Sequence, residues 1–277
     1  MKALLTLSTL ALLATGAMAG SGKSPKAPVT PPPEDPWITG SASIGYDSGY
    51  YFRGLWFSNN NFWGGLNFTV PVSDKLSFGF GGLYTQTVDT DVGADLDYSE
   101  LDLFASLNYD AGFAKFGLVF TSYQFFDTFS GSVGGSTFGF PNVSDSTISN
   151  ATDLGLTVAI PVGAANLYLG GWYDFKIDAF YFEAGVDYTI KITEKLSLVP
   201  VVQIGYGVDY YTYQPISGVD NGWTHVRTAL SAPYKITDSI TLTPYIAANF
   251  ALDAREQLNT VEDTNDLYGG VSLSIAF

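Results

Sequence analysis

The sequence predicts an all-β fold of about twelve long antiparallel strands, because three observations agree. Apolar residues recur at every second position over most of residues 38–277, which is the period of a strand and not of a helix. Three runs of similar pattern, VSDKLSF (72–78), ITEKLSL (192–198) and ITDSITL (236–242), place turn-forming residues between such segments. Longer Asp-, Asn-, Gly- and Ser-rich stretches separate other segments. Together these features indicate a meander of hairpins.

The amino-acid composition excludes several kinds of site and partner. Charged residues make up 14% of the chain, below the roughly one quarter that is typical of soluble globular proteins. There is no cysteine, so a disulfide framework, a thiol nucleophile and a thiolate metal site are excluded. Acidic residues number 27 and basic residues 12. Nucleic acid is therefore not an expected partner, because phosphate binding requires a basic surface.

The N-terminal residues predict an export signal followed by a tether. Lys2, the apolar run ALLTLSTLALLATG and the small residues AMA predict a signal peptide over residues 1–19, cleaved before Gly20. Residues 20–36 are rich in proline and predict a periplasmic tether. A membrane anchor for the first segment and a plain disordered terminus for the second are the alternatives. The ordered domain is expected over residues 37–277.

The expected strands follow from the alternation. They lie at 39–53, 61–71, 76–88, 98–109, 113–126, 151–162, 166–177, 179–191, 196–210, 223–235, 240–252 and 265–277. Tight turns are expected at 72–75, 110–112, 163–165, 192–195 and 236–239, and longer loops at 54–60, 89–97, 127–150, 211–222 and 253–264. The short connection at 177–179 breaks this order, so the strand count ranges from about ten to fourteen.

Alternation alone does not say which face is buried. The apolar face forms the core of a soluble sandwich, but it contacts lipid in a membrane barrel. The expected strands are longer than the roughly 5–6 residues common in globular proteins, and they suit the about 9–11 residues that cross a bilayer. Their other face carries mostly Gly, Ser, Thr, Ala and Tyr. We therefore predict a transmembrane antiparallel up-and-down β-barrel, with a soluble β protein as the alternative.

The C-terminal run YGGVSLSIAF ends in Phe277, with Leu273 and Ile275 at alternate positions before it and Tyr268 upstream. It resembles the assembly signal of bacterial outer-membrane proteins. The resemblance implies residence in outer-membrane lipid and recognition by the barrel-assembly machinery during biogenesis. An even strand number then puts both termini on the periplasmic side, with the lysine-bearing tight turns.

The segment GSASIGYDSGYYFRGLWFSN (40–59), which contains most of the first expected strand, resembles the opening of a family of outer-membrane porins whose solutes are largely unassigned. In that family a Ser-Asp-Tyr-x-Phe-Arg-Gly phrase closes the first strand. Residues 48–54 here read S-G-Y-Y-F-R-G, so Gly49 replaces the usual acidic residue. The resemblance covers about residues 38–85 and the C-terminus, and it implies a porin-like barrel.

The sequence offers few residues that could form a catalytic or metal site. The one histidine, His225, is turned inward by parity beside Arg227 and lacks a nucleophile within reach, so we expect a polar interior residue and no enzyme activity or cofactor. The loop DTDVGADLD lacks EF-hand spacing and is expected to be an acidic surface loop. Its carboxylates are a weak candidate calcium site: Asp89, Asp91, Asp95 and Asp97.

Strand parity also gives the expected interior charges. Both signs of charge occur, with six carboxylates against three Lys and Arg residues, among the expected pore-lining residues Arg53, Glu100, Asp102, Asp174, Lys176, Glu183, Asp187, Asp209, His225 and Arg227. Twelve strands fall between the filled eight-stranded barrels and the open sixteen-stranded ones. These features favour a porin-like channel for passive diffusion of small polar solutes with a modest cation preference. A non-conducting barrel that acts as adhesin, receptor or structural tether is the alternative.

Overall fold

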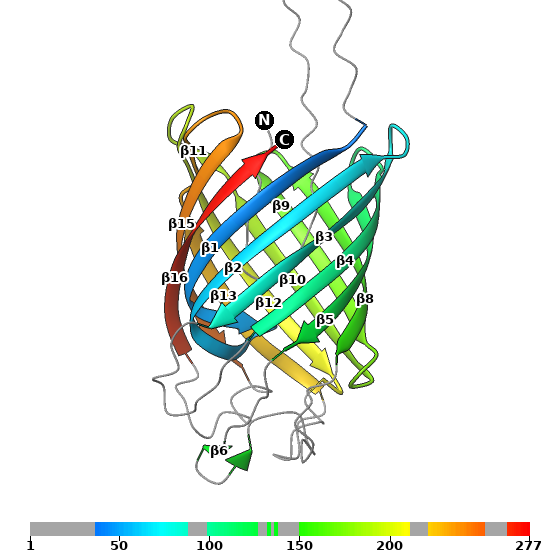
Figure 1. Ribbon diagram of the computed structural model, residues 1–277, viewed down its shortest axis with the longest axis vertical. Helices are drawn as coiled ribbons and strands as arrows, with labels where there is room; N and C mark the ends of the chain where they lie inside the picture. Colours follow the sequence, from blue (N-terminus) through cyan, green and yellow to red (C-terminus); the bar gives the residue numbers. More distant parts are fainter. Residues whose placement is uncertain are drawn as a thin grey trace, which may run out of the picture.

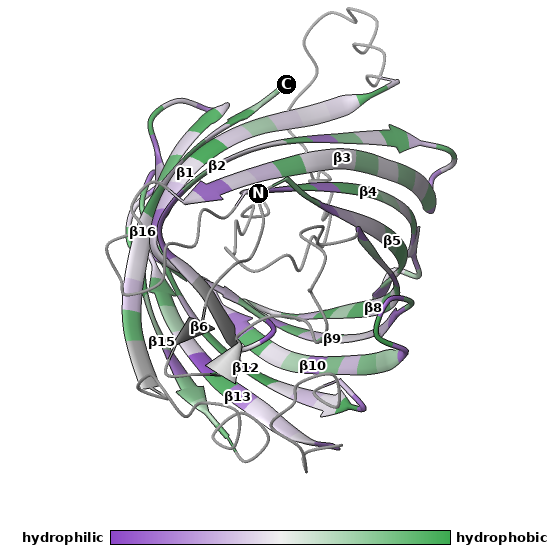
Figure 2. Ribbon diagram, turned by 60° about the horizontal axis from the view of Figure 1, so that its bottom comes forward, coloured by the Kyte–Doolittle hydropathy of each residue, from purple (hydrophilic) through white to green (hydrophobic). Residues whose placement is uncertain are grey.

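The computed structural model describes residues 37–87, 99–126, 150–210, 221–252 and 265–277, together with a two-stranded pair, β6 (Ser132–Val133) and β7 (Ser136–Thr137). Twelve long strands cross the molecule as a closed antiparallel barrel (Figures 1 and 2). These are β1 (Thr39–Phe52), β2 (Leu55–Pro71), β3 (Leu76–Thr87), β4 (Ser99–Asp110), β5 (Lys115–Phe125), β8 (Ala151–Val162), β9 (Ala165–Asp174), β10 (Ala179–Tyr188), β12 (Ser197–Val208), β13 (Asn221–Ser231), β15 (Ile240–Ala251) and β16 (Asn265–Ala276). Two short strands, β11 (Ile190–Lys191) and β14 (Tyr234–Lys235), extend the sheet at its rim.

Closure of the barrel leaves no free edge between its first and last strands. Each long strand pairs with its neighbours in the chain, and β1 pairs with β16 from Ser41–Ala276 to Asp47–Gly270. At the end of this seam the Gly40 amide donates to the Phe277 carbonyl at 2.7 Å, and the Phe277 amide donates back at 2.9 Å. The predicted closed all-β barrel is thus confirmed. Within the described ranges, no helix is long and apolar enough to cross a membrane.

The three repeated sequence runs fold into the same turn at one end of the barrel, which we call the short-turn end. In each run a hydroxyl oxygen accepts a hydrogen bond from the backbone amide three residues later, and this bond closes the turn. The donor amide and its acceptor lie 3.1, 2.9 and 3.0 Å apart for Leu76 to Ser73, Leu196 to Thr193 and Ile240 to Thr237. Local side-chain bonding of this kind favours turns over continued strand. Both ends of the barrel segment lie at this rim (Figure 1).

The opposite rim, which we call the long-loop end, differs from the sequence prediction in its first connection. A loop over 54–60 was expected and is wrong, because β2 begins at Leu55 and only Arg53 and Gly54 form the turn. Their φ angles are 51° and 82°, as a two-residue hairpin turn requires. The Asn-rich run at 59–61 lies inside β2, where Asn60 accepts a 2.6 Å hydrogen bond from the Tyr46 hydroxyl.

Other connections at the long-loop end are described only in part. The short connection expected near 177–179 is present as a turn over 175–178, and it begins where the Asp174 carboxylate accepts the Lys176 amide at 2.8 Å. Most of the expected loops at 89–97, 127–150, 211–222 and 253–264 lie outside the described residues.

Apolar side chains cover the outer surface of the barrel. The belt between the rims exposes aliphatic residues such as Ile44, Leu107, Leu156, Leu169 and Ile246. Exposed aromatic residues lie at both rims, with Tyr109, Phe113, Tyr188 and Phe277 at the short-turn end and Tyr84, Phe126, Phe175 and Trp223 at the long-loop end, and others such as Phe62 and Phe120 lie in the belt between them. Soluble proteins rarely expose so continuous an apolar surface. An outward-facing apolar belt with aromatic residues at both of its edges is the pattern of transmembrane barrels.

Candidate functional site

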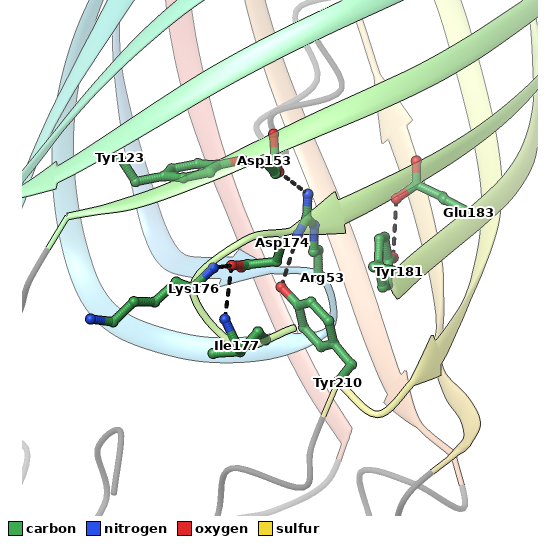
Figure 3. A network of polar contacts seen from close by, with 9 residues as sticks. All are labelled: Arg53, Tyr123, Asp153, Asp174, Lys176, Ile177, Tyr181, Glu183 and Tyr210. Carbon is green, nitrogen blue, oxygen red and sulfur yellow. Dashed lines mark hydrogen bonds and ion pairs between the residues drawn. The ribbon is translucent and has the colours of Figure 1, made fainter. Parts of the chain in front are cut away.

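The turn of the first hairpin reaches across the inside of the barrel. Arg53 Nη2 donates to Asp153 Oδ2 in an ion pair, and Arg53 Nη1 donates to the Tyr210 hydroxyl at 2.9 Å (Figure 3). Asp153 belongs to β8, and Tyr210 follows β12. In the ring of strands, β3, β4 and β5 separate β2 from β8, while β16, β15 and β13 separate β1 from β12. Arg53 therefore ties the first hairpin to the far wall.

Four aromatic rings surround the Arg53 guanidinium, and we call them the cage. Its Cζ atom lies 4.7 Å from the ring centroid of Phe52, 5.1 Å from Tyr181, and 5.5 Å from both Trp172 and Tyr210. The rings come from β1, β9, β10 and the segment after β12. Each distance is within the range of a cation–π interaction, which gains strength where water is excluded. The cage is thus a site for a planar or compact cation.

Asp153 supplies the negative charge of the cage. Its side chain is 0% exposed, and its Oδ2 also accepts the Tyr123 hydroxyl at 2.8 Å. Its other oxygen, Oδ1, is buried and has no hydrogen-bond partner among the described residues. Arg53 therefore uses only one of the two carboxylate oxygens, although a guanidinium can engage both at once.

Further groups extend the site along β10 and beyond β12. The Tyr181 hydroxyl donates to Glu183 Oε2 at 3.2 Å, and Gln203 Nε2 donates to the same oxygen. Burial raises the pKa of the Tyr210 hydroxyl, beyond the end of β12, to about 12. Tyr210 therefore stays neutral while its oxygen accepts the Arg53 bond. The cage rings are therefore neutral, and the Asp153 and Glu183 carboxyl groups lie beside them.

Gly54, the second turn residue, fits against a different wall. A Cβ atom at this position would lie 2.4 Å from His225 Nδ1 on β13. His225 is buried, and its Nδ1 lies 2.8 Å from the Thr224 hydroxyl. Asn249 Nδ2 on β15 donates to the Gly54 carbonyl at 3.5 Å. The turn is thus held between the cage on one side and β13 and β15 on the other.

A second cationic group lies on the inner face of β13. Arg227 is 1% exposed and its Nε donates to the Tyr268 hydroxyl at 2.7 Å. Tyr268 in turn stacks on Tyr51 with ring centroids 4.7 Å apart. Arg227 Nη1 is buried without a hydrogen-bond partner in the described part of the chain. The side chain is therefore only partly satisfied by protein groups.

Several inner-face glycines lie under aromatic rings. A Cβ atom at Gly155 or Gly170 would lie 2.3 or 2.1 Å from the Trp172 indole, and one at Gly185 would lie 2.2 Å from the Tyr168 ring. The rings therefore lie along the wall, over glycines of a neighbouring strand (Gly155 and Gly185) or of the same strand (Gly170), instead of projecting toward the barrel axis. This arrangement covers the glycine backbone, as in other sheets where an aromatic side chain lies over a cross-strand glycine.

Most of the predicted pore-lining residues lie in the interior. Buried there are Arg53, Glu100, Asp102, Asp174, Glu183, Asp187, His225 and Arg227. Lys176 and Asp209 do not share this position, because β9 and β12 end at residues 174 and 208 and both residues lie exposed in the connections that follow. A role in lining a conducting path stays a prediction for all ten.

Sequence reasoning missed several members of the site. Asp47 and Asp153 occupy inner positions, as do three residues of the cage, Trp172, Tyr181 and Tyr210. Strand alternation could have identified those that lie on strands. Asp153 directly precedes the outward-facing Leu154, and Trp172 lies two residues before Asp174, on the same face of β9. The expected loop at 54–60 concealed the turn at Arg53.

The remaining predicted sites are only partly described. Of the assembly-signal residues, Tyr268 points inward, Leu273 is half-buried, and Ile275 and Phe277 are exposed on the outside. Their recognition during assembly stays a prediction. The signal peptide (1–19), the tether (20–36) and the weak calcium candidate Asp89, Asp91, Asp95 and Asp97 lie outside the described residues.

Comparison with known proteins rests on structure. No family model matches the sequence, and no curated protein matches it significantly. An outer membrane channel from Pseudomonas putida F1 is 13% identical with a TM-score of 0.53, over 90% of this chain and 100% of that chain. The KdgM porin is 9% identical with a TM-score of 0.50, over 86% of this chain and 99% of that one. The translocator domain of the autotransporter NalP from Neisseria meningitidis is 11% identical with a TM-score of 0.51, over 88% and 89%. The chain therefore has the fold of the bacterial outer-membrane β-barrels, with twelve strands.

Proposed function

We propose that the protein is a narrow outer-membrane channel for passive diffusion of small polar solutes, with a modest preference for cations. The observation that carries this proposal is the charge of the inner face. Among the described residues, seven carboxylates are buried there, against two guanidinium groups: Asp47, Glu100, Asp102, Asp153, Asp174, Glu183 and Asp187 against Arg53 and Arg227. Charges in a confined lumen act strongly on a passing ion, and carboxylates favour cations.

Incompletely bonded polar groups support a hydrated interior. Tyr168 OH, Arg227 Nη1 and Asn249 Oδ1 are buried without hydrogen-bond partners in the described ranges. Buried polar groups are normally satisfied by protein or by ordered water. Water or a polar solute inside the barrel would satisfy all three. Two of the similar structures are described as a channel and a porin, in agreement with this proposal.

The first hairpin would set the width of the path. Its turn joins the β8–β12 wall through Arg53 and lies against β13 and β15 through Gly54. A solute would have to pass around the turn or move it. The inner positions near the short-turn end include small residues such as Ser43, Ala229 and Ser272, together with larger ones such as Tyr168 and Asp187. The constriction would lie toward the long-loop end, where the turn of the first hairpin crosses the interior.

The alternative is a non-conducting barrel that serves as adhesin, receptor or tether, and the same hairpin favours it. An ion pair buried on both sides holds the turn in place, and the aromatic contacts add to it. Side chains alone can fill a small barrel. The two functions differ in whether ions cross the refolded protein.

Planar-bilayer recording distinguishes them. We expect stepwise conductance from the refolded protein, with a reversal potential in a salt gradient that indicates cation preference. Lys195→Ala serves as the control for Arg53→Ala, because Lys195 is exposed in a turn at the short-turn end and is not among the predicted pore-lining residues. If neither the natural protein nor Arg53→Ala shows steps at any salt concentration, the barrel does not conduct and the alternative holds. We also propose that both termini face the periplasm.

A further inference from the structure

We propose that the cage and Asp153 form a binding site for guanidinium-bearing solutes, and that Arg53 is its resident occupant. The transport part of this inference rests on the proposed channel function, since it names the class of solute that would pass. The binding part stands on the geometry of the cage alone. A solute would enter the site by displacing the Arg53 side chain, which would also release the hairpin turn from the far wall.

The cage has the chemistry of a ligand site. Four rings lie 4.7–5.5 Å from the Arg53 Cζ atom, and three of them belong to strands or segments far from Arg53 in the sequence. Aromatic enclosures with a carboxylate recognise free organic cations in many proteins. The Asp153 side chain is fully buried, so its negative charge needs a cation beside it. Nothing in these contacts requires that the cation be covalently attached to the chain.

Arg53 fits this site imperfectly, and the mismatch leaves room for competition. Its Nη2 binds Oδ2 of Asp153, and its Nη1 is directed to Tyr210, so Asp153 Oδ1 stays without a partner among the described residues. A free guanidinium could place two parallel N–H groups on the two carboxylate oxygens, which is its preferred geometry with a carboxylate. Arg53 also stands at φ 51°, a left-handed conformation uncommon for a residue with a Cβ atom.

The position of the turn allows exchange without unfolding the barrel. The register between β1 and β2 shifts at Tyr50/Tyr51, just before the turn, so the tip is set apart from the regular ladder. The Asn249 bond to the Gly54 carbonyl is long, at 3.5 Å. Only the Arg53 side chain has to leave the cage for a solute to take its place.

The choice of guanidinium over other cations follows from the two kinds of contact. A quaternary ammonium would satisfy the rings but has no N–H for Asp153 or for the oxygen of Tyr210. A sodium ion would satisfy the charge but gains less from the rings. A guanidinium offers a flat face for stacking and a fork of donors for the carboxylate. We therefore expect the order guanidinium, quaternary ammonium, sodium.

Thermal unfolding of the folded barrel in detergent tests the site without requiring conduction. The probe is methylguanidinium chloride at millimolar concentration, compared with tetramethylammonium chloride and sodium chloride at equal ionic strength. In Arg53→Ala, methylguanidinium at about five times its dissociation constant should raise the midpoint by about 2–4 °C and saturate. Tetramethylammonium should do so less, and sodium should have no specific effect. The natural protein should need a much higher concentration, because Arg53 competes.

Two further variants keep the test decisive. Arg53→Ala/Asp153→Asn removes the carboxylate and should lose the methylguanidinium effect. Arg53→Lys keeps a cation beside Asp153, so it protects folding if Arg53→Ala does not fold, and it should respond at lower methylguanidinium concentration than the natural protein. Equal midpoints in methylguanidinium and sodium for both single variants would overturn the inference. So would an effect of the same size in the Asp153→Asn double variant. Because the readout is thermal, a barrel that binds without conducting would contradict only the channel proposal.

Discussion

Gly54 and His225 are in contact across the barrel interior, and a single added carbon would force them apart. A Cβ atom at Gly54 would lie 2.4 Å from His225 Nδ1, closer than real Cβ atoms approach. The turn of the first hairpin and the β13 wall therefore fit together only with glycine at residue 54. This contact gives a way to move the turn without touching Arg53.

Gly54→Ala should displace the turn and increase conductance. The substitution combines the steric conflict with His225 and the strain of φ 82°. Gly112→Ala is the matched control, because Gly112 has φ 86° but no atom within 4 Å of the added Cβ. Both variants carry about 1–2 kcal/mol of left-handed strain, so the comparison isolates the His225 contact. Single-channel recording should show a larger conductance for Gly54→Ala alone. Equal conductance in the two variants would mean that the turn does not limit the path.

The Arg53–Asp153 ion pair should show strong coupling in a double-mutant cycle. Removal of one partner leaves a buried charge without its counter-ion, and such single changes cost about 3–5 kcal/mol. Removal of both, as in Arg53→Met/Asp153→Leu, should cost less than the sum of the two single changes. Denaturant unfolding of the barrel in detergent measures all three. Additive losses would show that the two side chains do not interact in the folded protein.

Replacement of both arginines should shift ion selectivity. Arg53→Ala/Arg227→Ala leaves the buried carboxylates without the two buried guanidinium groups, so cation preference should rise, and the rise should shrink at high salt as screening shortens electrostatic reach. Reversal potentials in a salt gradient report the change. A plugged barrel would instead lose stability or begin to conduct. An unchanged reversal potential in a conducting double variant would place both arginines away from the conducting path.

Charge placed on the outer surface should cost stability according to depth. Leu156 lies in the middle of β8 and is 66% exposed, whereas Val162 ends the same strand at the short-turn end and is 56% exposed. Leu156→Arg should cost about 2–4 kcal/mol in a bilayer, and Val162→Arg about 0–1 kcal/mol. Unfolding free energies measured in lipid vesicles give both values. Similar small losses at both positions would show that this face does not contact hydrocarbon.

Surface labelling tests which end of the barrel faces outward. A cysteine at Lys176, in the connection between β9 and β10, should react with an impermeant maleimide on intact cells. One at Glu194, in a turn at the short-turn end, should react only after the outer membrane is opened. The chain has no other cysteine, so labelling is specific. The reverse pattern would invert the proposed orientation. Cysteines at Asp91 and Ser217, in two of the longer connections, should behave as the one at Lys176.

The barrel could be predicted from sequence because its determinants are local. Strand alternation, the Ser73 and Thr193 turns and the apolar outer face each depend on residues close together in the chain. The Arg53 site could not, because its members come from distant strands and meet only when the barrel closes. Parity marks Asp153 as inward, yet it does not tell which inward residue lies opposite.

The predicted loop at 54–60 is wrong for a more local reason. Runs of asparagine usually mark turns, but here Asn61 is a buried inner-face residue of β2 that accepts bonds from Ser58 and Thr87 hydroxyls at 2.8 and 3.1 Å. The turn itself has Arg in the position where Asn is usual for φ above zero. Arg53 is present there because its side chain meets the far wall, and that reason is invisible in a single sequence.

The partners of Arg53 also order events during folding. The hairpin that carries it comes early in the chain, but Asp153, Trp172, Tyr181 and Tyr210 are all at least one hundred residues later. Contacts between residues so far apart in the chain require closure of a long loop, so they form slowly. We therefore expect the charged tip of the first hairpin to stay unpaired until β8 to β12 are in place. Docking of Arg53 into the cage would then join the first hairpin to β8, β9, β10 and the segment after β12.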